Sequence, residues 1–146
     1  MAVNTRTEYA IRALLEIADS PQEAVSAQKI CENQDLPKKY VERLLSNLKA
    51  AGLVSSSAGA RGGYALAKEA SEITLQHVLM AVADDSLNPS CNASLQRFCP
   101  AGKCALSSFF SELGGKVQEL LSGYTLETIY KSWKGSTDET RKNISR

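Results

Sequence analysis

The sequence predicts a mainly α-helical protein: a winged helix-turn-helix domain with a two-stranded β-wing, followed by a long C-terminal dimerisation helix. Three observations predict this fold class. Apolar residues recur at helical spacing in six stretches, a glycine-rich hairpin directly follows the third stretch, and the fifth carries apolar residues at alternating intervals of four and three. A length of 146 residues with 43% hydrophobic content is typical of one globular domain, or of one small domain with an appended helix.

The first helix is predicted over residues 5–19. Its apolar positions follow the three-and-four spacing of an amphipathic helix and are Ala10, Ile11, Leu14, Leu15, Ile17 and Ala18. Thr5 followed three residues later by Glu8 matches a capping box, in which each side chain bonds the other residue's backbone N–H. Ser20 and Pro21 end the helix.

Two further helices form the predicted helix-turn-helix. Ser26 is the expected N-cap of a short helix that ends near Asn33, and Pro37 opens the next helix at a position where a missing N–H costs nothing. Gly52 closes this third helix in the left-handed conformation. The residues expected to face a core are Tyr40, Val41, Leu44, Leu45 and Leu48. The remaining polar and charged residues of this helix point elsewhere.

A hairpin follows at once. Leu53-Val54 and Tyr64-Ala65-Leu66 are the predicted strands, and the residues between them form a glycine-rich tip that carries Arg61. A helix-turn-helix followed by such a hairpin is a winged-helix arrangement. The third helix would then enter a major groove of DNA, with Arg61 on the backbone or in the minor groove.

The second half supplies two more long elements. Thr74 is the expected N-cap of a fourth helix, with Ile73 and Val78 as a hydrophobic staple, and Thr125 is the expected cap of the last helix. The helix between them carries a dimerisation seam of Leu106, Phe110, Leu113, Val117 and Leu120. Gly114-Gly115 within it is interpreted as a kink or a place of close helix approach. We therefore divide the chain into 1–83 (winged helix), 84–104 (cysteine loop), 105–134 (dimerisation helix and last helix) and 135–146 (polar, frayed tail).

The loop 84–104 holds three of the four cysteines. Cys91, Cys99 and Cys104 have seven and four residues between them, and the odd number leaves one thiol over in any disulfide framework. Three thiolates on a loop are typical of a metal site, and zinc and iron–sulfur clusters both accept them. Cys31 is interpreted as a small core residue, His77 as a surface or capping residue and Trp133 as a core residue.

Several motifs together resemble the Rrf2 family of bacterial winged-helix regulators. They are the runs 8–14, 40–45, 48–54, 59–66 and 73–75, and the resemblance extends to about residue 134. It implies binding of double-stranded DNA with two half-sites by a homodimer, through Lys38, Lys39, Glu42, Arg43, Lys49 and Arg61, with Glu42 and Arg43 reading base edges.

The resemblance also implies the cofactor. It favours an iron–sulfur cluster on Cys91, Cys99 and Cys104, [2Fe–2S] before [4Fe–4S]. The histidine that some members place three residues after the third cysteine is Ser107 here, so that ligand cannot be carried over. Glu8 matches the position of an acidic ligand that other members donate from the partner subunit, although the same residue is claimed by the capping box.

Other classes of protein fit the sequence less well. A single histidine and no nucleophile–base pair argue against an enzyme, so no catalytic residue is expected. No apolar run approaches the length of a membrane span and no secretion signal opens the chain, so a cytoplasmic location is expected. Three alternatives stay open: a zinc-stabilised regulator, a thiol-based redox regulator without a cluster, and a thiol-redox or electron-transfer protein that binds no DNA.

Overall fold

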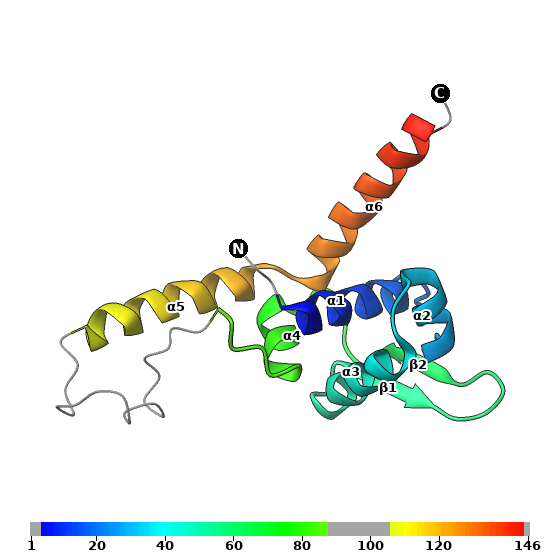
Figure 1. The fold of residues 1–146 in the computed structure, drawn as a ribbon, viewed down its shortest axis with the longest axis horizontal. Coiled ribbons are helices and arrows are strands. Elements are labelled where there is room, and N and C mark those ends of the chain that lie inside the picture. Colours follow the sequence, from blue (N-terminus) through cyan, green and yellow to red (C-terminus); the bar gives the residue numbers. More distant parts are fainter. Residues whose placement is uncertain (1–3, 88–105, 145–146) are drawn as a thin grey trace.

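A computed structural model describes residues 4–87 and 106–144, with side chains described as far as residue 136. Its elements are α1 (Thr5–Ala18), α2 (Ala27–Gln34), α3 (Lys38–Ala50), β1 (Val54–Ser57), β2 (Gly63–Leu66), α4 (Leu75–Ala81), α5 (Ser107–Gly123) and α6 (Leu126–Ile144). Helices α1 to α4 pack together with the two-stranded wing beside them, whereas α5 and α6 project from this body in different directions (Figure 1). The predicted winged helix-turn-helix fold is confirmed.

The start of α1 differs from the prediction. Asn4, not Thr5, is the N-cap: its Oδ1 accepts a hydrogen bond of 3.1 Å from the Arg6 N–H. Asparagine caps a helix at least as well as threonine. With the cap at Asn4, Glu8 falls one residue too late to reach back to the N-cap backbone, so the predicted capping box is wrong. The Glu8 carboxylate instead forms an ion pair of 2.7 Å with Arg12, one turn along the helix.

The helix-turn-helix forms as predicted, except that Pro37 is the N-cap of α3 and not part of its first turn. Ser26 Oγ accepts from the Lys29 N–H at 3.2 Å and begins α2. Helix α3 follows Pro37 and ends in a pair of bonds typical of a left-handed terminus, from Gly52 N to Lys49 O and from Leu53 N to Leu48 O. Gly52 has φ +71°, the conformation that this ending requires and that glycine adopts without a steric penalty.

The wing is pinned to the body at one point that the sequence did not suggest. Strands β1 and β2 pair antiparallel with Val54 opposite Leu66 and Ser56 opposite Tyr64. Tyr64 also pairs with Val25, the residue before the N-cap of α2, through two backbone hydrogen bonds of 2.8 Å. Gly63 passes so close to Val25 that a Cβ there would lie 2.6 Å from its carbonyl atoms. The root of the wing is thus held against the start of α2.

Helices α4 and α6 begin side by side. Thr74 caps α4, and the His77 Nδ1 accepts from the Thr74 N–H at 3.2 Å, so the two residues form the capping box that the first helix lacks. The chain returns beside this cap, where Leu126 N donates to Ile73 O at 2.7 Å. Helix α6 then runs to Ile144, so the predicted frayed tail from residue 135 is helical through most of its length.

Helix α6 is fixed to the end of α1 by buried apolar residues in its first turns and by polar contacts to Asp19. Leu126 is 1% exposed, and Ile129, Tyr130 and Trp133 pack on the core. Asp19 accepts from Tyr130 at 2.7 Å and pairs with Lys134 at 2.6 Å. The hydrogen bonds from Lys134 and Tyr130 hold the pKa of Asp19 below its usual value. These contacts attach α6 to the winged-helix body.

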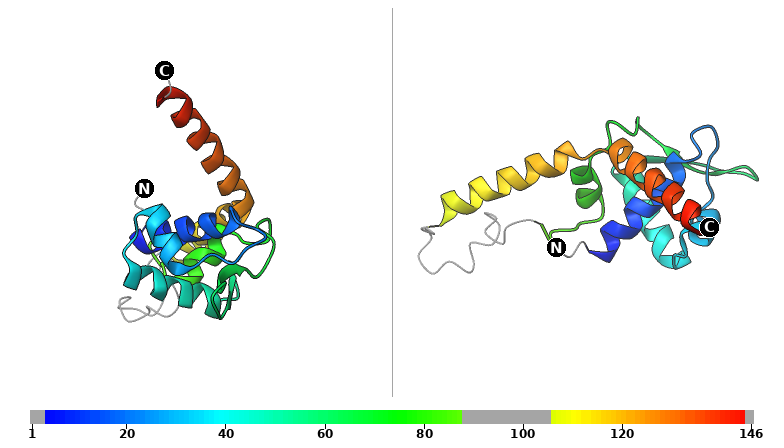
Figure 2. Two further views of the ribbon diagram at one scale, coloured as in Figure 1. Left: turned by 90° about the vertical axis from the view of Figure 1, so that its right-hand side faces the viewer. Right: turned by 90° about the horizontal axis from the view of Figure 1, so that it is seen from above.

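One hydrophobic core joins α1 to every element of the body. Its residues with less than 2% exposure include Leu14, Ile17, Ile30, Val41, Leu45, Leu48, Ile73 and Val78. In Figure 2 the left view shows α6 rising from this body, and the right view shows α5 extending away from it. Within the described residues, no helix combines the length and the apolar character needed to cross a membrane.

Candidate functional site

Helix α3 presents one apolar and one polar face. Its apolar residues Val41, Leu44, Leu45 and Leu48 are buried at 2% exposure or less. The opposite face carries the predicted DNA-contacting residues, all exposed: Lys38, Lys39, Glu42, Arg43 and Lys49. This pattern is typical of a recognition helix, whose apolar face packs on the core while its polar face is free to enter a DNA groove. Four of the five exposed residues are cationic.

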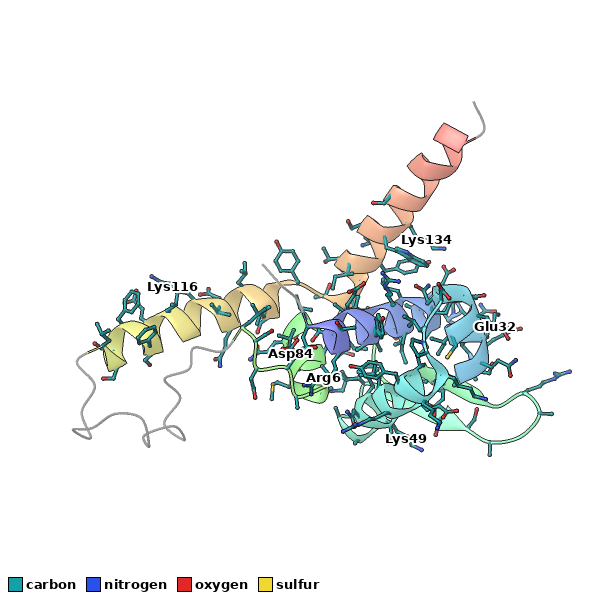
Figure 3. The ribbon with its side chains drawn as sticks, viewed as in Figure 1. Arg6, Glu32, Lys49, Asp84, Lys116 and Lys134 are labelled. Carbon is teal, nitrogen blue, oxygen red and sulfur yellow. The ribbon has the colours of Figure 1, made fainter. Side chains whose placement is uncertain are left out.

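The wing extends the same face. Arg61 is exposed at the tip, between the two strands. Figure 3 labels Lys49 at the underside of the body, where α3 lies beside β1 and the wing begins. The structure therefore brings the α3 residues and the root of the wing to one side of the domain, with Arg61 further out along the hairpin.

One contact on this side was not predicted. The Lys49 Nζ donates to Ser56 Oγ at 2.6 Å, joining the last turn of α3 to β1. Ser56 lies two residues after the buried Val54 on the same strand, so both side chains point to the same face of the hairpin. That alternation was visible in the sequence, but the partner of Ser56 was not.

Cys31 is a core residue, as predicted. It is 9% exposed within the core cluster and its thiol is free. Burial raises the pKa of this thiol, and the negative charge of Glu42 adds to the effect. A protonated, enclosed thiol is a poor metal ligand and a poor nucleophile.

The predicted metal ligands are only partly described. Cys91, Cys99 and Cys104 lie outside the described residues. Among the residues that are described, no group of three or more His, Cys, Asp and Glu side chains could hold a metal ion. Glu8 is described, and its side chain is 48% exposed at the start of α1. A carboxylate exposed at this position is accessible to a metal centre on another subunit, provided that its ion pair with Arg12 breaks.

The beginning of the cysteine segment is anchored to α1. Asp84 is 4% exposed and accepts hydrogen bonds from the Thr7 hydroxyl and, at 3.0 Å, from the Ser86 N–H. Burial alone would raise the pKa of this carboxyl, but the bonds from Ser86 and Thr7 outweigh it and hold the pKa below the usual value. Asp84 is labelled in Figure 3 below the start of α1, next to Arg6. Sequence reasoning missed both Thr7 and Asp84.

The first turns of α1 also touch α3. The rings of Tyr9 and Tyr40 meet edge to face, with centroids 5.5 Å apart and planes at 89°. Tyr40 lies in the first turn of α3, directly after Lys38 and Lys39. Thr7 and Tyr9 thus link the start of the cysteine segment to the start of α3 through two residues of one helix.

Helix α5 carries an apolar row that the rest of the described chain leaves exposed. Leu106, Leu113 and Leu120 of the predicted seam are 56%, 41% and 61% exposed, whereas Phe110 and Val117 are half-buried. Phe109 and Tyr124, at 56% and 49%, extend the row. Leu121, one turn after the half-buried Val117, is buried. The exposed leucines of the row therefore lie beside the buried edge of α5.

Comparison with known proteins gives a consistent answer over most of the chain. The family model described as Rrf2, iron-dependent transcriptional regulator, matches residues 3–132. The HTH-type transcriptional regulator IscR of Photorhabdus laumondii is 35% identical over 131 residues, covering 88% of this chain and 79% of the relative.

Two solved structures are similar to this fold. T. potens IscR has a TM-score of 0.69 at 28% identity, covering 93% of this chain and 90% of its own. CymR, the global cysteine regulator of B. subtilis, has a TM-score of 0.67 at 25% identity, covering 90% of this chain and 98% of its own.

Proposed function

This chain belongs to the Rrf2 family of non-enzymatic, DNA-binding transcriptional regulators, and we propose that it works as a homodimer whose hold on DNA depends on an iron–sulfur cluster. The observation that carries the proposal is the combination of an exposed cationic α3 face, a wing on the same side, and a three-cysteine segment whose first residue, Asp84, is bound to the helix behind them. Such a regulator acts in the cytoplasm, where its DNA is.

The DNA contacts fall into two kinds. Lys38, Lys39 and Lys49 are suited to phosphates, as is Arg61 on the wing, because their charge can follow the DNA backbone. Glu42 and Arg43 occupy the middle of the exposed face of α3, where a helix in the major groove reaches base edges. Arginine suits guanine and glutamate suits the cytosine amino group.

A second copy of the chain covers the apolar row of α5. Three leucines that are 41% to 61% exposed on one helix form an apolar surface, and burying this surface against a second copy of the chain would remove it from water. The row repeats at the interval of a helix pair, and a pair of domains is what two half-sites need. Pairing along α5 would place the two winged-helix domains of the dimer on either side of the α5 interface.

Cys91, Cys99 and Cys104 would hold the cluster, with Glu8 of the partner subunit as the fourth ligand. A bound cluster supplies iron whose oxidation or loss is the signal. The residues described fit this assignment as far as they reach, because Glu8 is exposed and its carboxylate is paired only across one helical turn. Three thiolates and one carboxylate complete the usual four positions.

The placement of α5 supports a ligand from the other subunit. A helix of 17 residues is about 25 Å long, and its N-terminal end lies far from the body in Figure 1. Cys104 stands two residues before Leu106 in the sequence, and two residues of chain span at most about 7 Å. Helix α1, which carries Glu8 of the same chain, begins near the other end of α5 (Figure 1). A partner that crosses α5 can bring its own Glu8 nearer to that end.

Helix α1 is the element through which the state of the cysteine segment would reach the DNA. Thr7 holds Asp84 at the beginning of the segment, Glu8 is the proposed ligand, and Tyr9 touches Tyr40 of α3. A displacement at either end of this short run moves the first turn of α1 as a unit, because a helix is stiff over this length. The expected effect is a change in the angle at which α3 meets the groove.

The cofactor claim is tested by purifying the chain without oxygen, reconstituting it with iron and sulfide, and recording its visible spectrum and metal content. The proposal requires bound iron and sulfide-to-iron absorption bands. A colourless, iron-free protein would refute it. Bound zinc would indicate the structural-metal alternative. A metal-free protein whose DNA affinity responds to thiol oxidation would indicate a thiol-based redox regulator without a cluster. The similarity to CymR favours this second candidate function.

The Glu8→Ala variant tests the fourth ligand. We expect its cluster to show altered absorption and faster loss on exposure to air. Glu127→Ala is the matched control, because Glu127 forms the same kind of one-turn ion pair with Lys131, at 2.8 Å, on α6. A Glu8→Ala cluster that behaves like that of Glu127→Ala would return Glu8 to its role beside Arg12.

A further inference from the structure

The contact between Lys49 and Ser56 gives the DNA-binding face a residue that nothing else assigns to it. We infer that Ser56 is a positioning residue: its hydroxyl holds the Lys49 ammonium at the junction of α3 and the wing, ready for a DNA phosphate. The inference rests on the proposed α3 face and deepens it, because it says how one of its cations is placed.

The junction itself is rigid. Only Leu53 separates the end of α3 from β1 once the Gly52 turn is made, and Leu53 and Val54 are both 2% exposed. Leu53 O accepts from Ala67 N at 3.0 Å beyond the paired strands. The backbone of Ser56 is therefore fixed relative to α3, on one side by this buried turn and on the other by the pairing of Tyr64 with Val25.

The Lys49 side chain would otherwise be free to wander. A lysine has four rotatable carbon–carbon bonds, and fixing them when DNA binds costs conformational entropy. The bond of 2.6 Å to Ser56 Oγ selects one arrangement before binding and uses one of three ammonium donors. The other two donors stay available to phosphate oxygens. Both residues are exposed, so this ammonium is accessible to an approaching duplex over the part of the chain that the structure describes.

Ser55 provides a contrast on the same strand. Side chains alternate along β1, so Ser55 points away from the face shared by Val54 and Ser56. It is an exposed serine of equal size and equal strand propensity, one position away. Any effect of removing a serine hydroxyl from the wing in general should appear at both positions, whereas an effect on Lys49 should appear at Ser56 alone.

The test measures DNA affinity by fluorescence anisotropy with the full-length protein and a duplex that the wild type has selected from a random pool. Ser56→Ala should raise Kd roughly three- to tenfold, the range for one lost hydrogen bond. Ser55→Ala and Ser56→Thr should bind as wild type, the second because it keeps the hydroxyl. Lys49→Ala should weaken binding and lower the slope of log K against log salt concentration by about one.

The decisive variant is the double substitution. In the Lys49→Ala background, Ser56→Ala should change nothing, because the ammonium it positions is gone. An unchanged Kd for Ser56→Ala, or an equal rise with and without Lys49, would overturn the inference. If Arg43→Ala and Lys49→Ala both leave affinity unchanged, the proposed DNA-binding face fails as well, whereas a loss with Arg43→Ala and none with Ser56→Ala refutes the positioning role alone. Thermal unfolding of each variant checks that the fold is kept.

Discussion

Replacing Gly63 by alanine should dislodge the wing from the body. A Cβ at this position would lie 2.6 Å from the carbonyl carbon and oxygen of Val25 and 2.9 Å from the Ser26 nitrogen. These are backbone atoms, which cannot rotate away, so the strand itself must shift. The two hydrogen bonds of 2.8 Å between Val25 and Tyr64 lie next to the clash. At about 1 kcal/mol net for each bond, their loss lowers the free energy of unfolding by about 2 kcal/mol, within the usual cost of overpacking.

Two measurements on the Gly63→Ala variant check this. Urea unfolding followed by circular dichroism should give the loss of about 2 kcal/mol, which corresponds to a fall of roughly 4–8 °C in Tm for a chain of this size. DNA affinity should fall as well, because the wing and the start of α2 are joined at Val25.

Gly135→Ala is the control for Gly63→Ala. A Cβ at Gly135 meets nothing within 4 Å and lies inside α6, so alanine should stabilise the helix by up to about 1 kcal/mol. If Gly63→Ala unfolds at the same urea concentration as wild type and binds DNA equally well, the account of the wing root is refuted.

Two further predictions concern the other parts of the site. The folded-state pKa of Asp84 lies below the ordinary value of 3.8, so its carboxylate stabilises the fold above that pH and the contribution disappears as the pH falls through the lower folded value. Asp84→Asn should therefore cost about 1–2 kcal/mol at pH 6 and less at pH 3, and an equal cost at both values would contradict this. The double variant Leu113→Glu/Leu120→Glu should sediment as a monomer while Gln118→Glu, on the opposite side of α5, keeps the state of the wild type. Sedimentation of the leucine variant as a dimer would remove α5 from the interface.

The sequence could predict those parts of the fold whose cause is local. Ser26 and Thr74 cap the helices that they precede, and Gly52 ends α3 in the left-handed conformation, because each needs only neighbours within a few residues. The prediction for the start of α1 was wrong because the same local signal occurs twice: Asn4 and Thr5 are adjacent, and both are good N-caps. Helix α6 was expected to end early because the residues from 135 onward are mostly polar. Polar residues such as Lys, Arg and Glu are nonetheless good helix formers, and no proline interrupts them.

The exposed face of α3 could also be predicted, because burying one side of an amphipathic helix exposes the other. What periodicity cannot give is the partner of a polar residue on another element. Ser56 with Lys49 joins residues from two elements, and Thr7 with Asp84 joins residues 77 positions apart. Each pairing depends on how helices and strands are stacked, which the pattern of one segment does not contain.

The buried polar residues mark where this stacking is specified. Among the described residues, Thr7, Glu16 and Asp84 are the polar side chains with less than 9% exposure. Thr7 binds Asp84 at the beginning of the cysteine segment, and Glu16 accepts hydrogen bonds from Asn33 and Gln34 at the end of α2. An apolar residue could fill either place, but it would pack against several neighbours equally well, whereas a buried hydroxyl or carboxylate is satisfied by one arrangement. Helix α1 therefore holds the segment at one end and the helix-turn-helix at the other in a defined relation, which a regulator that couples the two requires.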